Sequence, residues 1–183
     1  MAQATSEDKL IIAPFTWRHW PALWQLRWRQ LAEHGIHLPP AALPPYPAAV
    51  PRSDAEWDYH HMGEVYLREA GGFWLAYQGP LPVGHIGAQA IGDGIELRRM
   101  YVRADYRRRG IGRQLVATLV HHCRNQGVTV IELWTAAAGP GRRLYASANF
   151  QPVDQPGPAF TNVIAATGFT PGADEIRMRL QLG

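Results

Sequence analysis

The chain has 183 residues, is 46% hydrophobic and carries a formal net charge of +3. This length suits one globular domain, so we expect a single domain over residues 1–183. No run of eighteen apolar residues occurs, and the N-terminus lacks the basic and apolar segments of a signal peptide. The single cysteine, Cys123, cannot form an internal disulfide. We therefore expect a cytoplasmic protein without a membrane partner.

The N-terminal third predicts a strand, a helix and a loop. Residues 9–15 are typical of a strand, and Thr16 can cap a helix that runs to about residue 33. Five apolar side chains share one face of that helix, namely Trp17, Trp20, Trp24, Trp28 and Leu31. We favour a stripe that faces the core, and the alternative is an aromatic wall of a substrate pocket. Residues 34–52 hold six prolines and predict a loop.

The middle of the chain predicts a second helix and three antiparallel strands. Ser53-Asp54-Ala55-Glu56 has the pattern of a capping box, so a helix is expected over residues 54–69. Strands follow over residues 73–78, 82–91 and 95–102, with a hairpin turn at Gly92-Asp93-Gly94.

The C-terminal half predicts further alternation of helix and strand. A helix is expected over residues 110–125, a strand over 128–135 and a short helix over 142–147. The strand–helix–strand unit requires a parallel strand pair. Residues 159–165 are a candidate short strand, and residues 176–182 alternate like a last antiparallel strand. The chain is therefore expected to be an α/β (α+β) protein with a central mixed sheet of six or seven strands and helices on both faces.

Neighbouring histidines do not predict a metal site. His60-His61 and His121-His122-Cys123 lie within predicted helices, where adjacent side chains diverge by about 100°. No spacing typical of zinc ligands occurs. We expect no metal.

An arginine-rich turn joins the third strand of the meander to the helix at residue 110. The first N–H groups of a helix lack partners and attract anions, and Gly110 and Gly112 allow close approach to the main chain. Residues 95–113 carry seven arginines against Glu96 and Asp105. A small polyphosphate explains this charge more economically than nucleic acid, because no aromatic platform for single strands accompanies it.

The pattern Arg107-x-x-Gly110-x-Gly112 resembles the [Q/R]-x-x-G-x-[G/A] loop of the GNAT superfamily of N-acetyltransferases. The similarity extends upstream to Glu96 and downstream through Leu144-Tyr145-Ala146-Ser147-Ala148-Asn149-Phe150, which is similar to the family's Leu-Tyr-x-x-x-Gly-Phe. It covers residues 94–150. The resemblance implies a GNAT-like fold and acetyl-CoA as cosubstrate, with residues 94–150 as the core that binds it.

The resemblance also implies roles for individual residues. The thioester and the pantetheine arm would meet the backbone of Met100, Tyr101 and Val102. The phosphates would meet the turn formed by Arg107, Arg108, Arg109, Gly110, Ile111, Gly112 and Arg113. Tyr145 takes the position of the family's catalytic tyrosine, which protonates the leaving thiolate, and the alternative is a tyrosine that only packs against the core.

The general base is left open. Glu96 is the first candidate, and an ion pair with Arg98 or Arg99 is an equal alternative. In the branch that acetylates protein N-termini, a base Glu would stand at Leu133 and an Asn at Ala138. These two differences weaken the hypothesis that the acceptor is a protein N-terminus.

The function expected from these residues is acetyl transfer to the amine of a small molecule, with neither nucleic acid nor a membrane as partner. A GNAT-fold sensor that binds acyl-CoA without turnover and a protein N-terminal acetyltransferase remain alternatives. Homodimer formation stays open.

Overall fold

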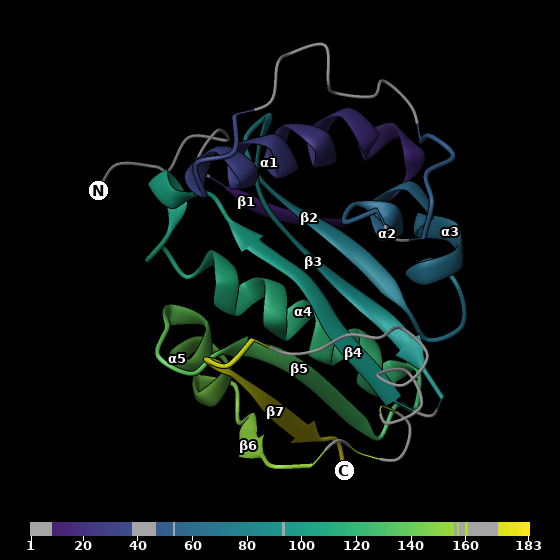
Figure 1. Ribbon diagram of the computed structural model, residues 1–183, viewed down its shortest axis with the longest axis vertical. Helices are drawn as coiled ribbons and strands as arrows, with labels where there is room; N and C mark the ends of the chain where they lie inside the picture. The colour runs from purple at the N-terminus through teal and green to yellow at the C-terminus, as the bar shows by residue number, and fades with distance from the viewer. Residues whose placement is uncertain are drawn as a thin grey trace.

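The computed structural model describes residues 9–37, 47–52, 54–92, 94–155, 157, 160 and 172–183. One seven-stranded sheet has the order β1-β2-β3-β4-β5-β7-β6 (Figure 1). Its strands are β1 (Leu10–Pro14), β2 (Gly72–Gln78), β3 (Leu81–Ile91), β4 (Gly94–Val102), β5 (Val130–Ala136), β6 (Gln151–Val153) and β7 (Glu175–Gln181). The helices are α1 (Trp20–Glu33), α2 (Trp57–His60), α3 (Met62–Val65), α4 (Ile111–Asn125) and α5 (Pro140–Ser147).

Strand directions confirm the predicted mixed sheet. β4 and β5 are parallel, whereas all other neighbouring strands are antiparallel. The edge strand β6 was not predicted, and Pro152 within it is tolerated because an edge strand need not donate on both sides. The predicted strand over 159–165 lies outside the described residues, apart from residue 160. Asp93 of the predicted turn and residues 38–46 of the predicted loop also lie outside them.

Alternate side chains of β2 explain why the sheet carries two cores. Phe73 and Leu75 pack with α1, α2 and α3, whereas Trp74 and Ala76 belong to the cluster that includes α4. Successive side chains of a strand point to opposite faces of the sheet. Helices therefore cover both faces, as predicted (Figure 1).

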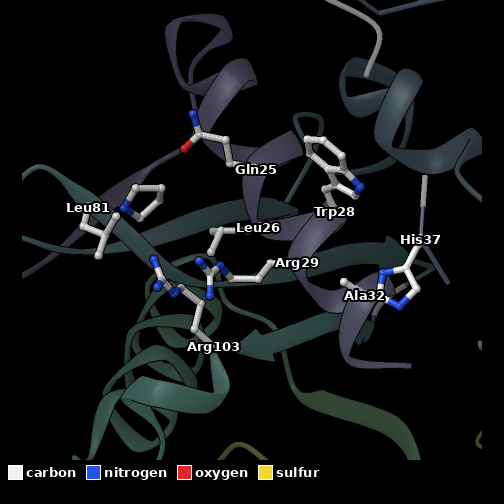
Figure 2. A pocket seen from close by; sticks show the side chains of 9 residues that line it. Gln25, Leu26, Trp28, Arg29, Ala32, His37, Leu81 and Arg103 are labelled. Carbon is white, nitrogen blue, oxygen red and sulfur yellow. The ribbon is translucent and has the colours of Figure 1, made fainter. Parts of the chain in front are cut away.

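The tryptophans of α1 have different environments. Trp20 and Trp24 are 3% and 7% exposed, which confirms the core-facing interpretation for these two. Trp17 lies in a 3-10 turn (Trp17–His19) before α1 and is 49% exposed. Trp28 borders a cavity of about 570 Å³ (Figure 2). The cavity lies between α1 and the start of β3, and its lining includes Gln25, Arg29, Leu81 and Arg103.

The prediction of one helix over residues 54–69 is wrong. Two single-turn helices, α2 and α3, are separated at His61, whose φ of −113° and ψ of 39° leave the helical region. The ring of His61 stacks on Trp57 at 4.4 Å and its Nδ1 donates to the Trp57 carbonyl, which closes α2. Gly63 then lowers the helix propensity of the next turn. Ser53 of the predicted capping box lies outside the described residues, and the Asp54 carboxylate accepts a hydrogen bond from the Glu56 N–H at 2.8 Å in the turn before α2.

β4 separates from β5 after three paired residues. The ladder joins residues 94–96 to residues 130–132 and then stops, although β4 continues to Val102. On its other edge, the register with β3 shifts between His85 and Gly87, as at a β-bulge. Arg99 lies in this bulge with a φ of 51°, a costly value for a residue other than glycine. A gap therefore opens between the carboxyl ends of β4 and β5.

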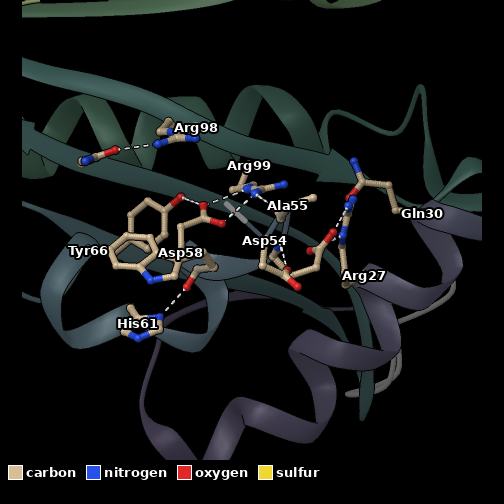
Figure 3. A network of polar contacts seen from close by, with 12 residues as sticks. Arg27, Gln30, Asp54, Ala55, Asp58, His61, Tyr66, Arg98 and Arg99 are labelled. Atoms are coloured by element: carbon tan, nitrogen blue, oxygen red, sulfur yellow. Dashed lines mark hydrogen bonds and ion pairs between the residues drawn. The ribbon is translucent and has the colours of Figure 1, made fainter. Parts of the chain in front are cut away.

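Asp58, Tyr66 and His85 hold this bulge in place, and Figure 3 shows Asp58 and Tyr66 beside Arg99. The Asp58 carboxylate accepts hydrogen bonds from Arg99 at 2.6 and 2.8 Å and another from the Tyr66 hydroxyl. Burial opposes ionisation of Asp58, but the bonds and charge of Arg99 lower its pKa below the ordinary value. Burial lowers the pKa of His85 to about 3, so its ring is neutral, and its Nδ1–H donates to the Arg99 carbonyl. Arg99 is thus fixed at its side chain and at its backbone.

A buried carboxylate joins β5 to β7. Glu132 is fully buried and accepts hydrogen bonds from Arg177 and, at 2.6 Å, from Arg179. The two arginines lie on β7, which pairs antiparallel with β5 as predicted.

Glu132→Gln should strongly destabilise the protein, because it leaves two guanidinium groups without their carboxylate. Removing one partner of a buried ion pair typically costs roughly 3–5 kcal/mol. Urea denaturation should show a fall in the free energy of unfolding of this order. Glu64→Gln, an exposed change on α3, is the matched control. Equal stability of the two variants would contradict the assigned role of Glu132.

Candidate active site

A cavity of about 930 Å³ occupies the gap between β4 and β5. Glu96 and Met100 line it from β4, and Tyr145 lines it from α5. Trp57 and Asp58 contribute from α2. The cavity therefore joins the predicted acid–base residues to the free edge of β4.

The aromatic wall of this cavity differs from the predicted one. Its aromatic residues besides Tyr145 are Trp57, Trp134 and Phe160, and within the described part of α1 only Gln30 lines it. No tryptophan of α1 lines this cavity, and Trp28 lines the cavity between α1 and β3 instead. An acceptor wall formed by α1 therefore stays a prediction. Period-two alternation could have identified Trp134, because it shares a face of β5 with Glu132 while Leu133 lies in the opposite core.

Glu96 is a half-buried carboxylate on the cavity wall. Burial raises its pKa, although the charges of Arg98 and Arg177 oppose this. Arg98 donates to Gln89 at 2.8 Å and Arg99 binds Asp58, and no ion pair of Glu96 occurs among the residues that the structure describes. The alternative of an ion pair with Arg98 or Arg99 is therefore absent from this arrangement. A carboxylate with a raised pKa is better suited to accept a proton near neutral pH.

Tyr145 both packs against the core and lines the cavity, the two alternatives considered for it. It is 6% exposed, packs edge-on against Phe150 at 5.8 Å and belongs to the core cluster of α4. It also lines the cavity. Burial raises the pKa of its phenol, which therefore stays protonated at neutral pH and can donate.

The turn before α4 presents a row of main-chain donors. Gly110 has a φ of 82° and Arg108 a φ of 64°. Within the described chain, the N–H groups of residues 108–113 have no hydrogen-bond acceptor. Successive free N–H groups at a helix N-terminus form a site for an anion. Gly112 has an additional role in packing, since a Cβ there would lie 3.2 Å from both Leu144 and Met100.

The predicted basic stripe does not form one patch. Arg99 binds Asp58, and Arg103 forms an ion pair with Asp105 at 2.7 Å. Arg109 packs 4.7 Å from the centre of the Tyr106 ring. The charge of these arginines is thus divided between the cavity and the turn.

Glu33 ties the end of α1 to this turn. It accepts hydrogen bonds from the Tyr101 hydroxyl at 2.7 Å and the Ala104 N–H at 3.1 Å, and it pairs with Arg107. Burial would raise the pKa of Glu33, but these partners lower it. The Arg107 guanidinium also donates to the Val102 carbonyl at 2.8 Å. Arg107 therefore positions the turn, and Tyr101 contributes its backbone, rather than its hydroxyl, to the edge of β4.

The structure places Leu133, which stands where the N-terminal acetyltransferase branch has its base Glu, outside the cavity. Leu133 is buried in the core against α4, away from the face that carries Glu96.

In the described ranges, no helix is long and apolar enough to cross a membrane. The same ranges contain no group of three or more metal-ligating side chains.

Comparison with known proteins gives consistent relatives. A sequence model described as "Acetyltransferase (GNAT) family" matches residues 20–150. N-acetyltransferase 8 of Rattus norvegicus is 34% identical over 102 residues, which are 51% of this chain and 46% of the relative. N-acetyltransferase 8 of Homo sapiens is 30% identical over 106 residues, covering 54% and 47%. The chain thus spans about half the length of the curated relatives it matches.

Solved structures share the fold. An acetyltransferase of the GNAT family from Staphylococcus aureus Mu50 has a TM-score of 0.69 at 22% identity and covers 96% of this chain and 100% of its own. The PaiA N-acetyltransferase of Thermoplasma acidophilum, in complex with coenzyme A, has a TM-score of 0.63 at 14% identity and covers 95% and 99%. Because the family model matches more than half of the sequence, the chain belongs to the acetyltransferase (GNAT) family of acyltransferases, as the motif at residues 107–112 predicted.

Proposed function

We propose that the protein transfers the acetyl group of acetyl-CoA to the amine of a small molecule. One observation carries this proposal: a single cavity brings together Glu96, Tyr145 and the unpaired edge of β4. That edge leads into the turn whose main-chain donors are free. We also propose that residues 1–183 form one domain with its coenzyme-binding core at residues 94–150, since the first and last strands share one sheet.

The free donors and the open strand edge fit acetyl-CoA. Its pyrophosphate would accept hydrogen bonds from the N–H groups of residues 108–113, aided by the dipole of α4. Its pantetheine amides would pair with residues 100–102, which have no partner on the β5 side in the described sheet. In this binding mode the thioester would lie beside Glu96 and Tyr145.

The proposed reaction needs three proton transfers, two from the acceptor nitrogen and one to the leaving sulfur. Glu96 accepts a proton from the acceptor ammonium, directly or through water, because only the neutral amine has a lone pair. The nitrogen then attacks the thioester carbonyl, and a backbone N–H of β4 stabilises the developing oxyanion. The C–S bond breaks and Tyr145 donates its proton to the sulfur. The nitrogen loses its second proton, which restores the Tyr145 phenol, and the N-acetylated product and coenzyme A result, while Glu96 releases the first proton to solvent.

The alternatives fit the cavity less well. A sensor without turnover needs neither an unpaired base nor a buried phenol beside the thioester. In an N-terminal acetyltransferase, the base would stand at Leu133, which faces the other core. The placement of Glu96 and Tyr145 therefore favours turnover with a small amine.

Tyr145→Phe should reduce turnover by about 10²–10⁴-fold, the usual contribution of one general acid. The affinity for acetyl-CoA should stay near that of the wild type, because the hydroxyl acts as charge builds on sulfur. Steady-state kinetics and calorimetry on one purified variant test this, with Tyr77→Phe on β2 as the matched control. Unchanged turnover would remove Tyr145 from the mechanism.

Glu96→Gln should abolish the acidic limb of the pH profile. In the wild type, kcat/KM should fall as the pH falls through the raised pKa of Glu96, above the ordinary glutamate value of about 4.3. The variant should be slower by about 10²–10⁴-fold and lack this limb. A limb that persists unchanged in Glu96→Gln would assign the base to another group.

A further inference from the structure

Two oppositely charged side chains of β4 line the cavity without pairing with each other. Glu96 and Arg98 stand two residues apart, so they lie on the same face of the strand. Neither takes part in an ion pair among the described residues. Arg98 donates from Nη1 to the side-chain oxygen of Gln89 at 2.8 Å, a neutral partner. Arg98 and Arg177 act on Glu96 through their charges alone, so neither Glu96 nor Arg98 has a direct ion-pair partner in the described structure.

The buried carboxylates around this face are already engaged. Asp58 is bound by Arg99 at 2.6 Å and by Tyr66. Glu132 is bound by both Arg177 and Arg179. The remaining acids of the cavity, Asp54 and Glu175, stand at its exposed rim. The protein thus supplies no buried carboxylate for Arg98.

Arg98 is well placed to bind an anion. A guanidinium has five N–H donors, and Gln89 holds one of them, which fixes the orientation of the group. The other donors can bind a carboxylate in the bidentate manner that arginine favours. Half-burial strengthens such a bond relative to one in water.

We propose that the acceptor is an amino acid or a close analogue, a molecule with a free amine and a free carboxylate. This inference rests on the proposed function. The carboxylate of the acceptor binds Arg98, and its amine lies at Glu96, where it loses a proton before attacking the thioester. A zwitterion forms a direct ion pair with each of the two side chains, whereas a simple amine leaves the Arg98 guanidinium without a directly bound carboxylate.

The remaining wall indicates an apolar side chain on this amino acid. Trp57, Trp134 and Phe160 line the same cavity. The Arg177 guanidinium lies 5.1 Å from the Trp134 ring and 5.0 Å from the Phe160 ring, which supports the two rings from behind. Such aromatic surfaces favour aromatic, aliphatic or thioether groups.

The proposal separates free amino acids from protein N-termini. The first residue of a polypeptide has the same amine, but an amide replaces its carboxylate. That amide cannot neutralise Arg98. An amino acid amide therefore serves as a small probe for the N-terminal alternative.

Matched sets of three amines test the proposal. Each set contains an amino acid, its amide and its decarboxylated amine, for phenylalanine, leucine and methionine. In at least one set, kcat/KM with acetyl-CoA should be higher by about tenfold or more for the free amino acid than for the other two amines. The amide and the decarboxylated amine lose the charged hydrogen bond between the carboxylate and Arg98. Arg98→Gln should erase this preference by slowing the amino acid alone. The matched control is Arg124→Gln, an exposed change on α4.

Two outcomes overturn the inference. Equal or better use of the amide or the decarboxylated amine in every set would do so, and so would a preference that persists in Arg98→Gln. Calorimetry on the protein loaded with coenzyme A separates this result from failure of the proposed function. Binding of an amino acid that depends on its carboxylate and on Arg98, without any turnover, would refute the transferase and keep the carboxylate site. No carboxylate-dependent binding would refute the site.

Discussion

The ion pair between Asp58 and Arg99 is the contact on which the geometry of the cavity depends. Arg99 has a positive φ, which costs free energy and persists only where surrounding contacts hold it. Asp58 holds its side chain and His85 its carbonyl, from opposite sides of the residue. The resulting bulge turns β4 away from β5 and exposes the strand edge next to Glu96. A residue of α2 thereby shapes the cavity in which we propose that the thioester lies.

Burial gives the two acid–base groups their chemical character. It raises the pKa of Glu96 above the ordinary glutamate value and raises that of Tyr145, as the proposed base and the proposed acid require. The surrounding arginines do not cancel this effect, because Asp58 and Glu132 already bind three of them. Among the buried and half-buried side chains that line the cavity, this pairing leaves Glu96 and Arg98 without a direct ion pair.

Local sequence patterns predicted most of the sheet and failed where distant residues decide. Alternation and turn residues identified the meander, the parallel pair and the last strand. Asn149, at the glycine position of the family's motif, adopts a left-handed conformation with a φ of 67°. The sequence does not show how the arginines of residues 95–113 divide between different partners, because Arg99 and Arg107 bind acids 41 and 74 residues away. The break at His61 depends on stacking against Trp57, which helix propensity does not report. Glu96 likewise forms no ion pair because Arg99, Arg177 and Arg179 bind Asp58 and Glu132, which lie far from it in the sequence.

A crystal structure with coenzyme A tests the central claim most directly, namely that the gap between β4 and β5 is the acetyl-transfer site. The predicted result is a pyrophosphate within hydrogen-bond distance of the N–H groups of residues 108–113. The pantetheine arm should lie along residues 100–102, with its sulfur close to the Tyr145 hydroxyl. Coenzyme A bound instead in the cavity between α1 and β3, beside Arg29 and Arg103, would contradict the account.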